Sequence, residues 1–143
     1  MDSLSILYPV IGMVFLTMFV ATRMYTHRVS FMKKNRIHPQ KVQTRSQALD
    51  QLTDTRASDN FLNLFEMPVL FYVACITLYV TNNVSLFLVV LAWAYVALRI
   101  VHSVIHCSYN TVMHRFMAFI SSTIVLFSIW ILIALQLVFG IHI

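Results

Sequence analysis

The sequence contains very few charged residues: Asp, Glu, Lys and Arg make up 10% of its 143 residues, whereas 59% are hydrophobic. A soluble globular domain has roughly 25% charged residues. The usual water-exposed surface is therefore excluded, and lipid must cover most of this chain. Cysteine is also scarce, and Cys75 and Cys107 form neither a metal-binding spacing nor a disulfide framework. We interpret both as small packing residues.

Four long apolar runs account for this composition, and we expect membrane spans at residues 6–25, 61–80, 84–106 and 116–141. Each is close to the ~20 residues that cross the hydrocarbon core of a bilayer. The runs are continuous and do not alternate with a period of two, which favours helices over barrel strands. We therefore predict an all-α fold: one integral membrane four-helix bundle, up-and-down, over residues 1–143. The first run has no basic region before it and no small-residue cleavage site after it, so we expect a retained span rather than a signal peptide.

All ten Lys and Arg residues lie beside two connections, the polar loop at 26–55 and the link between the third and fourth runs. Loops with excess Lys and Arg stay in the cytoplasm. Both termini are then expected outside, which in a bacterium means periplasmic termini in the inner membrane. Basic residues that flank apolar spans are topology signals rather than a stripe for nucleic acid, so we expect no nucleic-acid partner.

A polar stripe marks the start of the second run. At about 100° per residue, one arc of about 120° holds Arg56, Asp59, Asn60, Asn63 and Glu66. Glu66 is the deepest, and Pro68 is expected to kink or loosen the helix just after it. An ionisable residue in a span costs about 2.5–3.5 kcal/mol on insertion scales, so it needs a partner. The asparagines have an alternative role as hydrogen bonds between helices.

The third run carries a matching polar face, with Arg99, His102, Ser103 and His106 at spacings of three and four. Arg99 is the natural counter-ion for Glu66. The two faces predict a basic, hydrogen-bonding pocket for a small polyanion, because Arg binds carboxylates bidentately. The two histidines could instead ligate a metal, but no third ligand is evident, and we expect no metal site.

Two segments, RASDNFLNLFEMPVLFYV and RIVHSVIHCSYNTVMHRF, resemble the MAPEG family, the membrane-associated proteins in eicosanoid and glutathione metabolism. They look most similar to its bacterial branch. The resemblance implies a homotrimer that binds glutathione, as a co-substrate, between subunits near the cytoplasmic face. Arg56 and Asn60 match the family's RAxxN element, and Arg99 and His102 match its RxxH element. Arg115 is the match for the Arg assigned to the thiolate.

The family's NxxE element fits this chain in two registers, as Asn60 with Asn63 or as Asn63 with Glu66. His106 stands where glutathione-using members often have Tyr. The resemblance therefore implies catalytic roles for Arg115 and His106. The remaining residues that it implies as glutathione ligands are Arg56, Asn60, Asn63, Glu66, Arg99, His102 and Tyr109.

Three functions are compatible with these features. The first is a glutathione transferase or peroxidase that acts on lipophilic electrophiles reaching the site from the bilayer. The second is a non-catalytic lipid-binding or scaffold member of the same family, using the same pocket. The third is a small proton-coupled transporter in which Glu66 carries the proton. The expected partners are the lipid bilayer, further copies of the chain and lipophilic small molecules.

Overall fold

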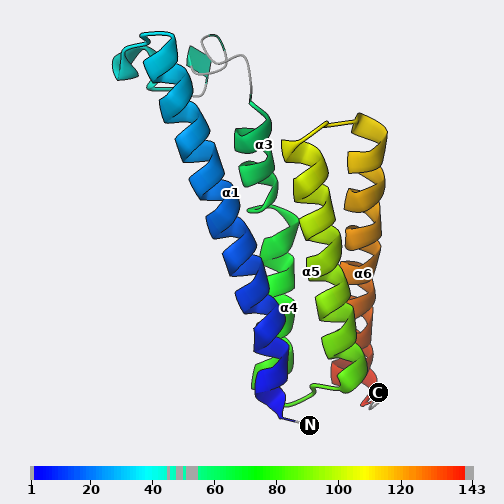
Figure 1. Ribbon diagram of the computed structural model, residues 1–143. Coiled ribbons are helices and arrows are strands. Elements are labelled where there is room, and N and C mark those ends of the chain that lie inside the picture. Colours follow the sequence, from blue (N-terminus) through cyan, green and yellow to red (C-terminus); the bar gives the residue numbers. More distant parts are fainter. Residues whose placement is uncertain (1, 45, 48–49, 51–54, 141–143) are drawn as a thin grey trace.

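The computed structural model describes residues 2–44, 46–47, 50 and 55–140, and over these ranges the chain is a helical bundle (Figure 1). Its long elements are α1 (Leu7–Lys34), α3 (Arg56–Asn63), α4 (Met67–Val80), α5 (Leu86–Cys107) and α6 (Val112–Phe139). Short 3₁₀ turns occur at Ser3–Ile6 and Pro39–Val42. Within the described ranges, four segments are long and apolar enough to span a membrane, with α3 and α4 together forming the second. The predicted four-helix membrane bundle is confirmed.

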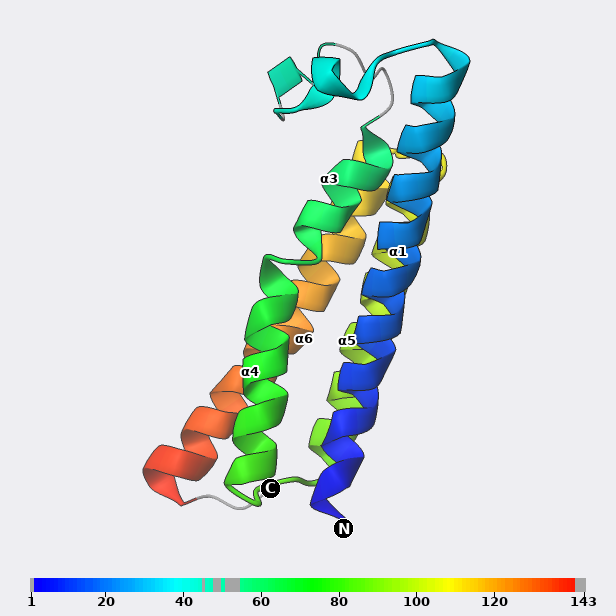
Figure 2. The same cartoon turned by 90° about the vertical axis from the view of Figure 1, so that its left-hand side faces the viewer.

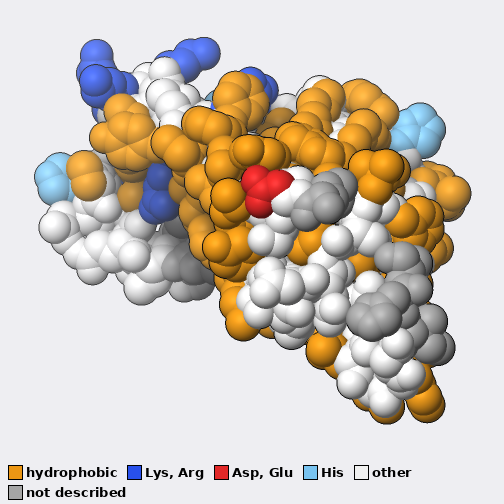
Figure 3. All heavy atoms as spheres, turned by 90° about the horizontal axis from the view of Figure 1, so that it is seen from below, with side chains coloured by type: hydrophobic (Ala, Val, Ile, Leu, Met, Phe, Trp, Pro, Cys, Tyr) orange, Lys and Arg blue, Asp and Glu red, His pale blue; other side chains and the backbone are white. Residues whose placement is uncertain are grey.

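Neighbouring spans run antiparallel, and Figures 1 and 2 show that α1 begins and α6 ends at the same end of the bundle. The chain following α1 and the α5–α6 connection lie at the other end, where the basic residues gather. Helix α1 packs on α3, α4 and α5, whereas α6 packs on α5 and α4. Figure 3 views the end that carries the termini, and hydrophobic side chains cover much of it.

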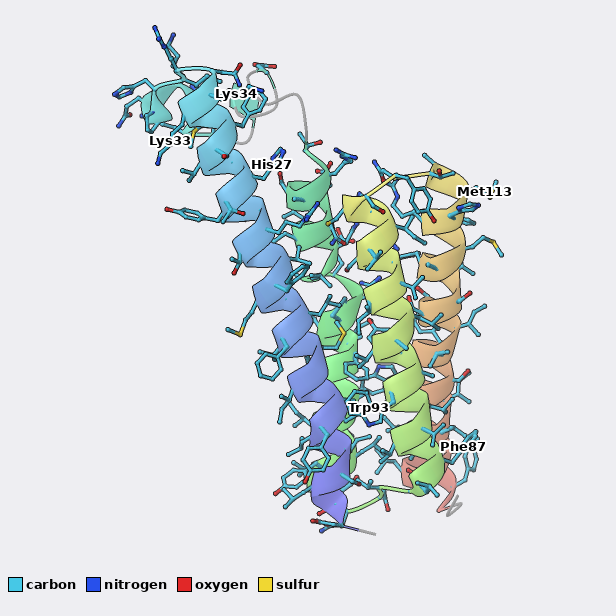
Figure 4. The ribbon with its side chains drawn as sticks, in the orientation of Figure 1. His27, Lys33, Lys34, Phe87, Trp93 and Met113 are labelled. Carbon is cyan, nitrogen blue, oxygen red and sulfur yellow. The ribbon has the colours of Figure 1, made fainter. Side chains whose placement is uncertain are left out.

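Large apolar side chains are exposed on the outside of the bundle as well as buried within it. Phe15 and Phe19 of α1 are each 65% exposed, as a lipid-facing surface requires. Inside, the Phe71 and Tyr95 rings stack with centroids 4.5 Å apart. Gly12 lets α1 approach α5, because a Cβ there would lie 3.4 Å from the Trp93 ring. Figure 4 shows Trp93 between these two helices.

Helix α1 is longer than predicted. It continues to Lys34 rather than ending near residue 25, so the prediction of a loop over 26–34 is wrong. The physical reason is that no Gly or Pro lies between Gly12 and Pro39, and Lys33 and Lys34 complement the negative end of the helix dipole. Helix α6 begins at Val112, before the predicted start at 116, while the predicted end at 141 lies outside the described residues. Residues 46–55 contain no Gly or Pro and predict a helical extension before the second span, but this stretch also lies largely outside the described residues.

The second span is broken between α3 and α4, as the position of Pro68 predicts. Pro68 has no N–H to donate to the carbonyl of Leu64, and Glu66 has a non-helical backbone (φ −96°, ψ −99°). The break removes the helical partner of the Asn63 carbonyl. Arg99 of α5 replaces it, because its Nη2 donates to the Asn63 oxygen at 2.9 Å. Broken helices are tolerated in membranes where a neighbour satisfies the freed carbonyl in this way.

Candidate functional site

The helix break opens onto a cavity of about 740 Å³ between the second span, α5 and α6. Its polar lining includes both ionisable and amide groups: Asp59, Asn63, Glu66, His102, His106 and Arg115. Its apolar lining consists of Leu62, Phe65, Val112, Phe116 and Phe119. A cavity of this size, with apolar walls and a few convergent polar groups, is typical of small-molecule sites.

Arg115, at the start of α6, is held in place from two directions. Its Nη1 donates to Asn110 Oδ1 at 2.9 Å and to His106 Nε2 at 3.0 Å. These two bonds use both hydrogens of Nη1 and none of those on Nε and Nη2. Asn110 can sit in the tight α5–α6 connection because Asn tolerates its left-handed backbone (φ 50°). The guanidinium is thus positioned before any ligand arrives.

The two histidines of the cavity have assignable tautomers. A guanidinium only donates, so His106 Nε2 is an acceptor and its imidazole is neutral, with the proton on Nδ1. His102 Nδ1 lies 3.2 Å from the Arg115 carbonyl, which only accepts, so this nitrogen carries a proton. In its neutral form His102 then has an acceptor at Nε2. Both rings are almost fully buried.

These assignments leave one buried donor and one buried acceptor beside the cavity. Among the described residues, neither His106 Nδ1 nor His102 Nε2 has a hydrogen-bond partner. An unsatisfied buried polar atom costs about 1–3 kcal/mol. Both histidines line the cavity together with Arg115, so a cation, a buried hydrogen-bond donor and a buried hydrogen-bond acceptor lie close together behind and on its wall. Such a set can bind an acidic group, take up its proton and stabilise the resulting anion.

Arg99 lies behind the cavity wall rather than in it. The side chain is fully buried, and its hydrogen bond goes to the Asn63 carbonyl. Its Cζ lies over the Tyr95 and Phe119 rings, 5.9 and 5.6 Å from their centroids. Glu66, the expected counter-ion, interacts with the Arg99 charge, but the hydrogen bond of Arg99 goes to a backbone carbonyl and not to this carboxylate. The Glu66 side chain is exposed instead. The physical reason is that the helix break offers Arg99 a closer acceptor.

The two asparagines of the stripe face different neighbours. Asn60 is fully buried and accepts from Ser103 Oγ at 3.3 Å, while its Nδ2 lies 3.4 Å from the Cys107 sulfur. It therefore joins α3 to α5 as an interhelical hydrogen bond. Asn63 and Glu66 line the cavity. Of the two registers of the NxxE element, Asn63 with Glu66 is the one whose residues both line the cavity.

Two further predicted residues lie outside the cavity lining. Arg56 donates to the Ser108 carbonyl at 2.5 Å, and the side chain of Tyr109 is 59% exposed and lies beside His114. Sequence reasoning also missed two contributors. Asp59 lines the cavity, and its place in the polar stripe was the available signal. Asn110 holds Arg115, and only the structure shows this contact.

The predicted basic pocket is thus less basic than expected, with one Arg and two carboxylates among the residues that line it. In the part of the chain that the structure describes, no three His, Cys, Asp or Glu side chains come together as a metal site would require. A family model described as the MAPEG family matches residues 6–135. Searches of the curated proteins and of the solved structures found no match.

Proposed function

The chain belongs to the MAPEG family, and on that premise we propose that it binds glutathione in the cavity beside Arg115 and transfers it to lipophilic electrophiles. The observation that supports this proposal is Arg115 on the cavity wall, with His106 and His102 lining the cavity beside it and each keeping one buried nitrogen without a partner among the described residues. Bound glutathione would supply a thiol, whose thiolate is the nucleophile toward an electrophilic carbon or a hydroperoxide.

Arg115 would hold the sulfur as a thiolate, through the Nε and Nη2 hydrogens that Asn110 and His106 do not use. His106 would add a second donor from Nδ1. The thiol proton has an acceptor in His102 Nε2, which would pass it to the leaving group or to water. Phe116 and Phe119 form the apolar wall against which a lipophilic substrate would lie.

The remaining groups suit the peptide part of glutathione only in part. Asp59 and Glu66 can pair with its ammonium group, but its two carboxylates need more cations than Arg115 alone supplies. We therefore include a second copy of the chain in the proposal: as in the homotrimer that the family resemblance implies, a neighbouring subunit would cover the open side and contribute a cation. The bacterial inner membrane, with the basic end of the bundle in the cytoplasm, is part of the same proposal.

Glutathione titration of the detergent-purified protein tests the proposal, with heat of binding and thiolate ultraviolet absorbance as readouts. We expect Arg115→Ala to remove the absorbance, Arg115→Lys to retain part of it, and Lys34→Ala to leave it unchanged. Lys34 is a matched control because it also loses one charge but stands at the far end of α1 (Figure 4). No binding at millimolar glutathione would refute the proposal. Binding without thiolate would favour the non-catalytic alternative.

A further inference from the structure

Two further cavities lie on the other side of α5. They share no lining residue with the cavity beside Arg115, here called the glutathione cavity. The first, here called the α1–α5 groove, has a volume of about 290 Å³. Its walls are mostly apolar and come from two helices, with Leu16, Phe19 and Val20 on α1 and Ile100 and Val104 on α5. Phe19 and Val104 are well exposed on the outside of the bundle, so the groove opens sideways toward lipid.

The second cavity, here called the basic recess, has a volume of about 420 Å³ and continues from the groove toward the basic end of the bundle. The two share Arg23 and Cys107. The recess also includes His27 of α1 and Arg56 of α3, and Figure 4 shows His27 on the part of α1 that lies opposite α3. The apolar α1–α5 groove therefore ends in the basic recess.

The charged residues that line the groove and the recess differ from those that line the glutathione cavity. Among the described residues that line the groove and the recess there is no Asp or Glu, whereas the glutathione cavity has two carboxylates. Among the described residues, Arg23 donates one long hydrogen bond of 3.4 Å, from Nη2 to the Cys107 carbonyl, and a guanidinium has five N–H donors. The positive charges of Arg23 and Arg56 in the recess attract anions, and Arg23 retains donors for one.

The depth of Arg23 fits the boundary of a bilayer. It follows Ser3, the first residue of the span, by twenty residues, which is roughly 30 Å of helix and close to the thickness of the hydrocarbon core. Lipid phosphates lie just beyond that boundary. An occupant with an anionic head at the depth of Arg23 and an apolar chain beside Phe19 and Val104 is an amphiphile with the shape of a membrane lipid.

We propose that the groove and the recess together form a binding site for an anionic phospholipid, with an acyl chain in the groove and the phosphate beside Arg23 and Arg56. Basic pockets between transmembrane helices recognise anionic headgroups in this way. The site needs no glutathione, so it stands or falls independently of the proposed function.

The test is native mass spectrometry of the full-length protein in detergent, with phosphatidylglycerol and phosphatidylcholine of identical chains. We expect the wild-type protein to retain phosphatidylglycerol preferentially. Arg23→Gln should weaken that retention about fivefold, which corresponds to about 1 kcal/mol for one basic residue near an anionic surface. Lys33→Gln is the matched control, because Lys33 is exposed at the far end of α1, and it should leave retention unchanged.

A second pair of variants tests the groove. Val104→Trp should fill it and lower the retention of phosphatidylglycerol, while Val101→Trp, at an exposed position of α5 outside the groove, should not. Equal retention of both lipids by the wild-type protein, or equal losses in Arg23→Gln and Lys33→Gln, would overturn the proposal. Displacement of the lipid by glycerol phosphate alone would show a free-anion site instead. A change of oligomeric mass in Val104→Trp would show that a second copy covers the groove.

Discussion

Two substitutions of Asn110 test whether the position of Arg115 matters to the chemistry. They separate the two roles of Asn110, which are to accept a hydrogen bond from Arg115 and to adopt a left-handed backbone. Its side chain accepts a hydrogen bond from Arg115 Nη1 at 2.9 Å, and its backbone has φ 50°. Asn110→Gly removes the hydrogen bond and keeps the backbone relaxed, because Gly adopts positive φ freely. Asn110→Ala removes the same hydrogen bond and adds strain of about 1–2 kcal/mol.

The size of each effect follows from these contacts. A hydrogen bond to a charged group contributes about 1.5–3 kcal/mol, and we take about 1 kcal/mol here because both side chains are only partly buried. Arg115 keeps its second anchor at His106 Nε2, so Asn110→Gly should loosen the guanidinium rather than remove it. We expect about a fivefold smaller ratio of thiolate to thiol in bound glutathione. The thermal stability should fall slightly in Asn110→Gly, by the loss of this hydrogen bond, and fall further in Asn110→Ala, which adds the backbone strain.

The assay is thiolate absorbance during glutathione titration, paired with thermal unfolding in the same detergent. The reasoning is wrong if Asn110→Gly retains the wild-type absorbance within twofold at unchanged stability, because Arg115 would then need no second anchor. It is also wrong if the Gly and Ala variants unfold at the same temperature, because the connection would then impose no strain on Ala.

Three further predictions concern the bundle and its orientation. Ser103→Ala removes the hydrogen bond to the buried Asn60 and should destabilise the bundle by about 0.6 kcal/mol, the average for such bonds in membranes, measured by denaturant titration. Gly12→Ala should unfold near the wild-type temperature, since its Cβ meets Trp93 at 3.4 Å, whereas the larger Gly12→Leu should lose about 1–3 kcal/mol by overpacking. In a variant without the native cysteines, an impermeant thiol reagent on intact cells should label Asn82→Cys and not Lys33→Cys; the reverse pattern would invert the predicted topology.

The architecture could be predicted from the sequence because a membrane span depends on the apolar content of about 20 residues. One or two polar residues in such a stretch change its apolar content little. The helix break was also predictable, since Pro68 lacks the hydrogen-bond donor that a continuous helix needs. The extent of α1 was not, because His27 to Lys34 are polar enough for a loop yet contain no helix breaker. Polarity alone does not distinguish a solvated helix from a loop.

The candidate site was predictable as a face and not as a set of contacts. Helical spacing brought Asn63, Glu66, His102 and His106 to one cavity, because those residues project from neighbouring helices toward the same side. Spacing could not show that Arg99 turns away to bind a backbone carbonyl, since that acceptor exists only once the helix is broken. Nor could it show that Asn60 faces α5, because an arc of about 120° is wide enough to face two neighbours.

Arg99 connects the broken helix to the cavity. A buried arginine whose Nε and Nη1 have no hydrogen-bond partner among the described residues is a poor source of stability, since desolvating a charge can outweigh what its contacts return. Its contact with the Asn63 carbonyl, however, satisfies the backbone that Pro68 and the turn at Glu66 leave open. The break in turn leaves Glu66 outside the helix and at the cavity. A continuous helix would be easier to accommodate in a bilayer, so the residues of this break are better explained by the cavity they shape than by the stability of the bundle.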